Sequence, residues 1–266
     1  MNPDLDRLQP YPFERLRGLL AGNMPPAALP HINLSIGEPK HPTPKLIIDA
    51  LIAAAPALSS YPATLGTDDL RQSIASWLAR RFALPVIDPS NQVIPVAGSR
   101  EALFAFAQAV IDRGRRARVV MPNPFYQIYE GAALLAGAEP LFLPCTPENG
   151  FRMDFGLIDA ATWNDVQLVY VCSPGNPHGR VMRLPEWREL FALADRHGFI
   201  IASDECYSEI YFDEASPPLG GLQAAVALGR RGFDRLVVFG SLSKRSNAPG
   251  LRSGFVAGDA TVLKSF

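Results

Sequence analysis

The chain is poor in the residues that most directly indicate disulfides or metal sites. It has three cysteines and four histidines among 266 residues. The cysteines, Cys145, Cys172 and Cys206, are odd in number and far apart. This usage is typical of a reducing cytosol rather than of a disulfide framework. The histidines do not show the spacing of metal ligands, so no metal site is predicted. We therefore expect a cytoplasmic protein.

The sequence also lacks an excess of charge of either sign. Lys and Arg number 25 against 26 Asp and Glu, which gives a net charge of -1. This balance gives no electrostatic reason to expect a nucleic-acid partner. No apolar run approaches the roughly 18 residues that span a bilayer. The first residues show neither the positive flank nor the apolar run of a signal peptide. No membrane partner is predicted.

What the sequence does contain is the balance of a globular protein, with 48% hydrophobic and 19% charged residues. A chain of this length can bury a large core and predicts one or two domains. The first 42 residues are proline-rich and weakly periodic. We expect residues 1–42 to form an N-terminal arm and part of a small domain, and residues 43–266 to form one large domain.

From residue 43 onward, short apolar runs alternate with helical patterns. Thr43, followed by Pro44, is predicted to cap the first helix, Thr67 to cap the second, and Gly198 to end a later one. This alternation predicts an α/β fold with a mainly parallel sheet that is flanked by helices. Strands are predicted at 92–97, 118–121, 139–143, 167–172, 199–203, 235–240 and 254–257, and helices at 45–55, 67–82, 100–111, 125–136 and 185–197.

Polar groups follow several of these strands, at the edge where sites of such sheets lie. Gly98, Ser99 and Arg100 stand at a predicted helix start, where free N–H groups attract an anion such as phosphate. The alternative is that Ser99 only caps the helix. The sequence Ser-Pro-Gly-Asn-Pro-His-Gly at 173–179 fixes the amide of Asn176 in a tight loop. The alternative is a plain turn that this amide stabilises.

Two further strands end in ionisable side chains. Asp204 leaves an apolar strand three residues before Tyr207, and a buried carboxylate is costly unless it meets a cation or hydrogen-bond donors. The alternative is that Asp204 is a helix cap. Lys244 follows another strand, with serines nearby and Arg252 eight residues on. The alternative is a solvated surface lysine.

Together these groups match the needs of a phosphorylated pyridine aldehyde. A lysine can bond to the aldehyde, and a carboxylate can hold the proton of the pyridine nitrogen. Backbone N–H groups, serines and an arginine can bind the phosphate. The sequence therefore predicts pyridoxal 5′-phosphate as the cofactor.

The motifs resemble those of the fold type I, pyridoxal-phosphate-dependent aminotransferases of classes I and II, over the whole chain. The matching motifs are Ile36-Gly37-Glu38-Pro39, Tyr-Pro-Ala-Thr-x-Gly at 61–66, Asn176-Pro177-x-Gly179, Asp204-x-x-Tyr207, and Ser241-x-Ser243-Lys244 with Arg252. The last three of these motifs, in this order and spacing, are highly specific.

The resemblance implies a role for each matching residue. Lys244 would carry the cofactor and later move a proton, and Asp204 would pair with the ring nitrogen. Asn176 and Tyr207 would hydrogen-bond the ring hydroxyl, and Tyr126 would stack on the ring. The phosphate would be surrounded by Gly98, Ser99, Arg100, Ser241, Ser243 and Arg252.

The resemblance also implies partners. Tyr61 would reach the phosphate of a partner subunit, which predicts a homodimer. Gly37 would lie near the carboxylate of the substrate. The expected reaction moves an amino group between an amino acid and a 2-oxo acid.

Finer similarity points to one branch of the family. Residues 8–16 and 241–254 resemble the bacterial N-succinyldiaminopimelate aminotransferases of lysine biosynthesis. The branch implies N-succinyl-LL-2,6-diaminopimelate as the amino donor and 2-oxoglutarate as the acceptor. Family members continue into a C-terminal small domain with an arginine that binds the substrate carboxylate. The chain stops at Phe266, in a helix expected after Asp259, so we expect this domain to be missing and the activity of the chain alone to stay open.

Three other functions compete with this one. Ser241-x-x-Lys244 matches the Ser-x-x-Lys motif of penicillin-binding proteins, but the Lys-Thr-Gly motif that should follow does not occur. A lyase or another fold type I enzyme with the same cofactor is an alternative that the cofactor residues cannot separate. A non-catalytic regulatory domain would have a basic DNA-binding segment before Ile36, and none is seen. No Rossmann or P-loop glycine motif occurs.

Overall fold

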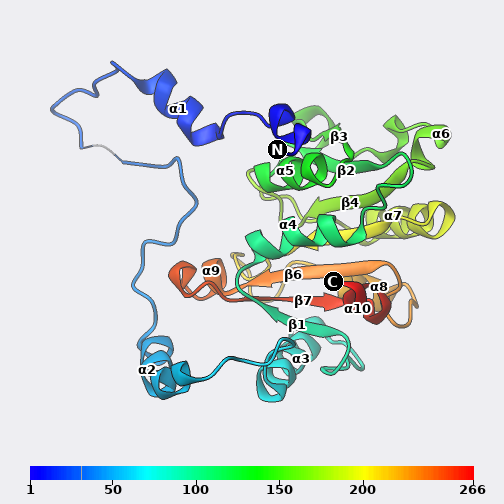
Figure 1. Cartoon of the computed structure of the whole chain (residues 1–266). Coiled ribbons are helices and arrows are strands. Elements are labelled where there is room, and N and C mark those ends of the chain that lie inside the picture. The colour runs from blue at the N-terminus through cyan, green and yellow to red at the C-terminus, as the bar shows by residue number, and fades with distance from the viewer. Residues whose placement is uncertain (31) are drawn as a thin grey trace.

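A seven-stranded sheet lies at the centre of the computed structural model, which describes residues 1–30 and 32–266 (Figure 1). The strand order is β1-β7-β6-β5-β4-β2-β3. Neighbours from β3 to β6 pair in parallel, and β7 runs antiparallel to both β6 and β1. The strands are β1 (Val93–Val96), β2 (Arg118–Asn123), β3 (Glu139–Pro144), β4 (Val166–Cys172), β5 (Ile200–Asp204), β6 (Leu236–Ser241) and β7 (Gly254–Gly258).

Helices cover both faces of this sheet, because side chains along each strand alternate between two cores. Val169 and Val171 of β4 belong to a core that includes residues of α3, α7 and α8, whereas Leu168 and Tyr170 pack in a core with α4, α5 and α10. The helices are α1 (Pro12–Leu20), α2 (Lys45–Ala54), α3 (Asp68–Phe82), α4 (Ser99–Val110), α5 (Gln127–Leu135), α6 (Ala160–Trp163), α7 (Leu184–His197), α8 (Gly221–Ala227), α9 (Leu242–Arg245) and α10 (Ala260–Ser265).

All seven predicted strands are confirmed, with ends that shift by one or two residues. Thr67 caps α3 by accepting from the N–H of Leu70 at 3.3 Å, and Gly198 ends α7 with a φ of +83°. The prediction that Thr43 caps α2 is wrong. Pro44 holds the N-cap position, and the Thr43 hydroxyl donates instead to the carbonyl oxygen of Asn247 at 2.6 Å. A tertiary hydrogen bond has replaced the local one.

The chain before α3 stands apart from the layered core. Among the described residues, Ala75 is the first whose side chain is buried. Figure 1 shows α1 and α2 outside the body of the sheet and its helices. Helix α2 is apolar yet has no buried residue, and Leu46 and Ile52 are 80% and 67% exposed. The N-terminal turn returns to the body, where Asp4 pairs with Arg113 at 3.3 Å.

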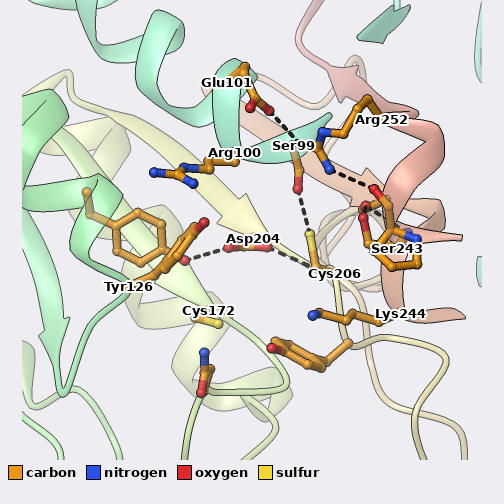
Figure 2. Close-up of a pocket in the computed structure, with 15 residues that line it drawn as sticks. Ser99, Arg100, Glu101, Tyr126, Cys172, Asp204, Cys206, Ser243, Lys244 and Arg252 are labelled. Carbon is orange, nitrogen blue, oxygen red and sulfur yellow. Dashed lines mark hydrogen bonds and ion pairs between the residues drawn. The ribbon is translucent and has the colours of Figure 1, made fainter. Parts of the chain in front are cut away.

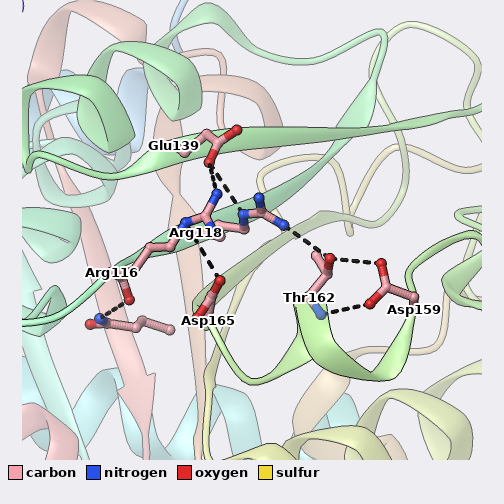
Figure 3. A network of polar contacts seen from close by, with 7 residues as sticks. Arg116, Arg118, Glu139, Asp159, Thr162 and Asp165 are labelled. Atoms are coloured by element: carbon pink, nitrogen blue, oxygen red, sulfur yellow. Dashed lines mark hydrogen bonds and ion pairs between the residues drawn. The ribbon is translucent and has the colours of Figure 1, made fainter.

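A network of polar side chains joins the amino ends of β2 and β3 to α6 (Figure 3). The guanidinium of Arg118 donates to a Glu139 carboxylate oxygen at 3.2 Å and to the Thr162 hydroxyl at 3.0 Å. Arg116 binds the same Glu139 oxygen at 3.3 Å and lies 3.5 Å from Asp165. The network fixes the edge of the sheet that lies opposite the carboxyl ends of the strands.

None of the helices in the described part of the chain is long and apolar enough to cross a membrane. The three cysteines are free thiols.

Candidate active site

A cavity of about 350 Å³ opens at the carboxyl ends of the parallel strands (Figure 2). Cys172, Asp204 and Ser241, the last residues of β4, β5 and β6, contribute to its wall. The cavity therefore lies at the edge of the sheet where the sequence predicts the site, at the ends of the parallel strands. Ten of the predicted site residues line it: Ser99, Arg100, Tyr126, Asn176, Asp204, Tyr207, Ser241, Ser243, Lys244 and Arg252.

Asp204 stands buried at the end of β5, with 6% of its surface exposed. Its Oδ2 accepts the hydroxyl of Tyr129 at 2.6 Å, and its Oδ1 accepts the N–H of Cys206 at 3.2 Å. The segment after Asp204 forms turns rather than a helix, so the helix-cap alternative is wrong. Two donors satisfy a carboxylate that would otherwise be costly to bury.

Tyr129 is a site residue that the sequence reasoning missed. Its side chain is fully buried and stacks on Tyr170, with ring centroids 4.6 Å apart. Burial and then the nearby charge of Asp204 raise the pKa of the Tyr129 phenol well above its ordinary value, so it stays a hydrogen-bond donor. One signal was available, because Tyr126 and Tyr129 lie one helical turn apart and therefore share a face.

Lys244 lies in the short helix α9, which starts where β6 ends. Ser241 is the N-cap of this helix, because its hydroxyl oxygen accepts the N–H of Ser243 at 3.0 Å. Lys244 is half-buried and lines the cavity, and its amine donates to the carbonyl oxygen of Gly37. Gly37 does not line the cavity itself, but this contact brings the N-terminal arm to it.

The expected anion cradle is built at the start of α4. The N-cap is Gly98, with a φ of +106°, and Ser99 is the first helical residue, so the alternative that Ser99 caps the helix is wrong. The Ser99 hydroxyl instead meets the Cys206 thiol at 3.1 Å. Arg252 reaches over this turn and pairs with Glu101 at 2.8 Å, as Figure 2 shows.

Gly98 has no room for a side chain. A Cβ there would lie 2.3 Å from Nη2 of Arg252, at a φ that L-residues rarely adopt. We expect Gly98→Ala to displace Arg252 and weaken pyridoxal phosphate binding about tenfold or more, a size that matches about 1–3 kcal/mol of strain. Cofactor titration by absorbance measures this effect.

Gly229 offers a matched control. Its φ is +75°, yet nothing would lie within 4 Å of a methyl group at that position. Gly229→Ala adds backbone strain without touching the cavity, so the affinity for pyridoxal phosphate should be unchanged. Equal loss of affinity in both variants would contradict the role given to Gly98.

The aromatic residues predicted for the cavity lie at its wall. Tyr207 is half-buried, and burial followed by the charge of Asp204 raises the pKa of its phenol to about 12. Tyr126 meets Tyr129 edge to face, with centroids 5.8 Å apart. Tyr61 does not line the cavity of its own chain and is fully exposed.

Glu205 follows Asp204 but points to the other side of the backbone. Its Oε1 accepts the N–H of Gly221 at 2.7 Å and the hydroxyl of Ser203 at 2.9 Å. Burial raises the pKa of this carboxyl from 4.5 to about 7, and these two donors and Arg81 oppose the shift.

This shift predicts a pH dependence of stability. Between pH 4.5 and 7 the folded chain keeps the Glu205 proton that the unfolded chain loses, so the free energy of unfolding falls as pH rises through this window. The loss amounts to about 3 kcal/mol and is complete above about pH 7. We expect urea unfolding of wild type relative to Glu205→Gln to show this decline. Parallel pH profiles of the two proteins would refute it.

The residues around the cavity fit pyridoxal phosphate. Hydroxyls of Ser99 and Ser243, the guanidinium of Arg252 and the N–H groups at the start of α4 form a donor set that suits a phosphate. The buried carboxylate of Asp204 suits a protonated ring nitrogen, and the Lys244 amine suits an aldehyde.

Comparisons with known proteins agree with this fit. Residues 30–266 match the family described as "Aminotransferase class I and II". An LL-diaminopimelate aminotransferase from Nitratidesulfovibrio vulgaris (strain DSM 19637 / Miyazaki F) is 35% identical over 87% of this chain and 58% of the relative. That from Syntrophobacter fumaroxidans is 36% identical over 97% of this chain and 65% of the relative. The chain thus spans about three fifths of the curated relatives it matches.

Two solved structures extend the comparison. An aminotransferase from Neisseria meningitidis Z2491 superposes with a TM-score of 0.95 at 54% identity, over 100% of this chain and 67% of that one. A probable N-succinyldiaminopimelate aminotransferase from Thermus thermophilus gives 0.78 at 25% identity, over 88% of this chain and 61% of that one.

The sheet, with its cavity at the strand ends, defines the large domain of a fold type I pyridoxal-phosphate enzyme. The chain belongs to the class I and II aminotransferase family, whose cofactor is pyridoxal 5′-phosphate.

Proposed function

We propose that the chain is the cofactor-binding part of an aminotransferase that moves an amino group between an amino acid and a 2-oxo acid. The observation that carries this proposal is the cavity that gathers Lys244, Asp204 and the donor set around Arg252. When bound, pyridoxal phosphate supplies an aldehyde to hold the amino group and a ring to take up electrons.

The residues of the chain then have distinct tasks. The Lys244 amine would hold the aldehyde and, when free, would be the base that takes up the proton of the substrate Cα. Asp204 would pair with the ring nitrogen, and Tyr129 and the Cys206 N–H hold Asp204 in place. Tyr207 and Asn176 line the same cavity and would face the ring hydroxyl.

Amino transfer is separated from lyase chemistry by its need for an acceptor. The chain loaded with pyridoxal phosphate should consume more than one equivalent of amino donor per cofactor, and form glutamate, only when 2-oxoglutarate is added. Carbon dioxide or a cleaved product formed without the acceptor would contradict the proposal and favour a lyase.

For the amino donor we propose a diaminopimelate, in its N-succinyl-LL form. The resemblance of residues 8–16 and 241–254 favours this form, and the structure from Thermus thermophilus carries that name. The curated relatives are named for LL-diaminopimelate itself. Parallel assays with the succinylated and the free donor decide between them, and preference for the free donor would overturn the succinyl assignment.

We also propose that two copies of the chain assemble around the cofactor. The fully exposed Tyr61 and the unburied apolar helix α2 lie next to each other in the sequence and support this assembly. Tyr61→Ser should then weaken cofactor binding while leaving the fold intact. A chain that sediments as a monomer at all concentrations, with cofactor affinity unchanged in Tyr61→Ser, would exclude the assembly.

The division into an arm and small-domain part at 1–42 and a large domain at 43–266 stays a proposal, and so does a cytoplasmic location. Limited proteolysis tests the division, because cleavage should fall first near residue 42.

A further inference from the structure

The segment 206–220 joins β5 to α8 without helix or strand, and the side chain of Glu205 connects its two ends. Glu205 precedes the segment, and its carboxylate accepts the N–H of Gly221, which follows the segment, at 2.7 Å. The Ser203 hydroxyl donates to the same oxygen at 2.9 Å. Only 6% of Glu205 is exposed.

Glycine at the far end of the segment allows this approach. A Cβ on Gly220 would lie 2.9 Å from Oε2 of Glu205 and 2.6 Å from the ring of Phe82. A Cβ on Gly221 would lie 3.1 Å from Oε1 of Glu205. The carboxyl group and the rings of Phe82 and Trp187 therefore fill the space that side chains at these two positions would need.

Arg81 of α3 holds the middle of the same segment. Its Nε donates to the Glu209 carboxylate at 2.8 Å, and its Nη2 donates to the carbonyl oxygens of Ser208 and Pro218 at 3.1 and 3.3 Å. The Arg81 side chain is 10% exposed. A largely covered cation with three acceptors from one segment restrains that segment strongly.

The segment bears on the proposed cofactor site because its first residues form part of the wall of the cofactor cavity. Asp204 and Tyr207, on either side of Glu205, line the cavity, whereas Glu205 lines a separate small cavity with Trp77 and Arg245. Glu205 thus lies outside the site but in the middle of its Asp204-x-x-Tyr207 motif.

We propose that Glu205 is a positioning residue, whose buried carboxyl group fastens the ends of segment 206–220 and so holds the Tyr207 phenol in the cofactor cavity. The inference rests on the proposed function, because that function gives Tyr207 its task. Loss of the side chain leaves the Gly221 N–H and the Ser203 hydroxyl unpaired in the interior.

The first test needs no cofactor. In hydrogen exchange on the cofactor-free chain, Glu205→Ala should speed exchange across 206–220 by about tenfold or more, because one or two hydrogen bonds are lost. Ser203→Ala, which removes one donor, should produce a smaller increase and keeps the test decisive if Glu205→Ala does not fold. Met121→Ala, a change in the core on the opposite face of the sheet, to which no residue of 206–220 belongs, is the matched control. Unchanged exchange in Ser203→Ala and Glu205→Ala, or an equal increase in Met121→Ala, would overturn the proposal.

The second test uses the visible band of bound pyridoxal phosphate as a function of pH. A phenol that donates to the ring oxygen stabilises the deprotonated form of the bound cofactor. Tyr207→Phe should therefore raise the pH at the midpoint of the change in the visible band by about one unit. Glu205→Ala should raise it similarly, the double variant should add little more, and Glu205→Gln, which keeps an acceptor, should restore the wild-type midpoint.

The two failures are distinguishable. A midpoint in Glu205→Ala equal to that of wild type, while Tyr207→Phe is shifted, would refute positioning by Glu205. A wild-type chain that shows no visible band with pyridoxal phosphate would refute the proposed function, and hydrogen exchange would still decide whether Glu205 fastens the segment.

Discussion

Lys244→Ala is expected to lower amino transfer by the loaded chain by about 10⁴-fold, the upper range for loss of one acid–base group. The variant loses both the bond to the cofactor aldehyde and the amine that moves the proton. It should also lose the visible band of the lysine-bound cofactor, while the phosphate donors around Arg252 still hold pyridoxal phosphate without a covalent bond. Absorbance and stopped assays measure the two effects.

The sequence offers a sharp control for this variant. The chain has only four lysines, at positions 40, 45, 244 and 264. Lys264 is exposed in α10 and does not line the cavity. Lys264→Ala should therefore behave as wild type. Retention of the band in Lys244→Ala would show that another group bonds to the cofactor.

Asp204→Ala is expected to have the second largest effect. Loss of a preorganised charge beside a reacting group typically lowers the rate by about 10²–10³-fold. The change also strips the buried Tyr129 hydroxyl of its acceptor, which lowers the free energy of unfolding by about 1–3 kcal/mol. Turnover and urea unfolding report the two losses separately.

A double variant separates the two roles of Asp204. Asp204→Ala combined with Tyr129→Phe removes both partners of the hydrogen bond, so most of the lost stability should return while turnover stays low. Tyr129→Phe alone should keep most activity, because Asp204 still accepts from the Cys206 N–H. Recovery of turnover in the double variant would mean that Asp204 acts only through the fold.

The sequence predicted the sheet well because buried strands carry their own signal. Apolar runs such as 167–172 form interior strands of the sheet, here β4, and their ends indicate the edge at which the cavity lies. Helices α1, α6, α8 and α9 were missed. Helices α8 and α9 are only seven and four residues long, so their periodicity is too short to detect.

Contacts between side chains that lie far apart in the chain could not be predicted from the sequence. Tyr129 meets Asp204 across 75 residues, and Lys244 meets Gly37 across 207. A local capping rule predicted Thr43 as the N-cap of α2, but its hydroxyl donates to the carbonyl oxygen of Asn247. Such contacts depend on how α5, α9 and the arm pack against the sheet, which no local pattern encodes.

The central claim is that Lys244 binds pyridoxal phosphate in this cavity. The chain is incubated with pyridoxal phosphate, reduced with borohydride and digested, and the modified peptide is identified by mass spectrometry. We predict a single stoichiometric label on Lys244, absent from Lys40, Lys45 and Lys264. A folded chain that gains no label, or gains it on one of the other three lysines, would contradict the account.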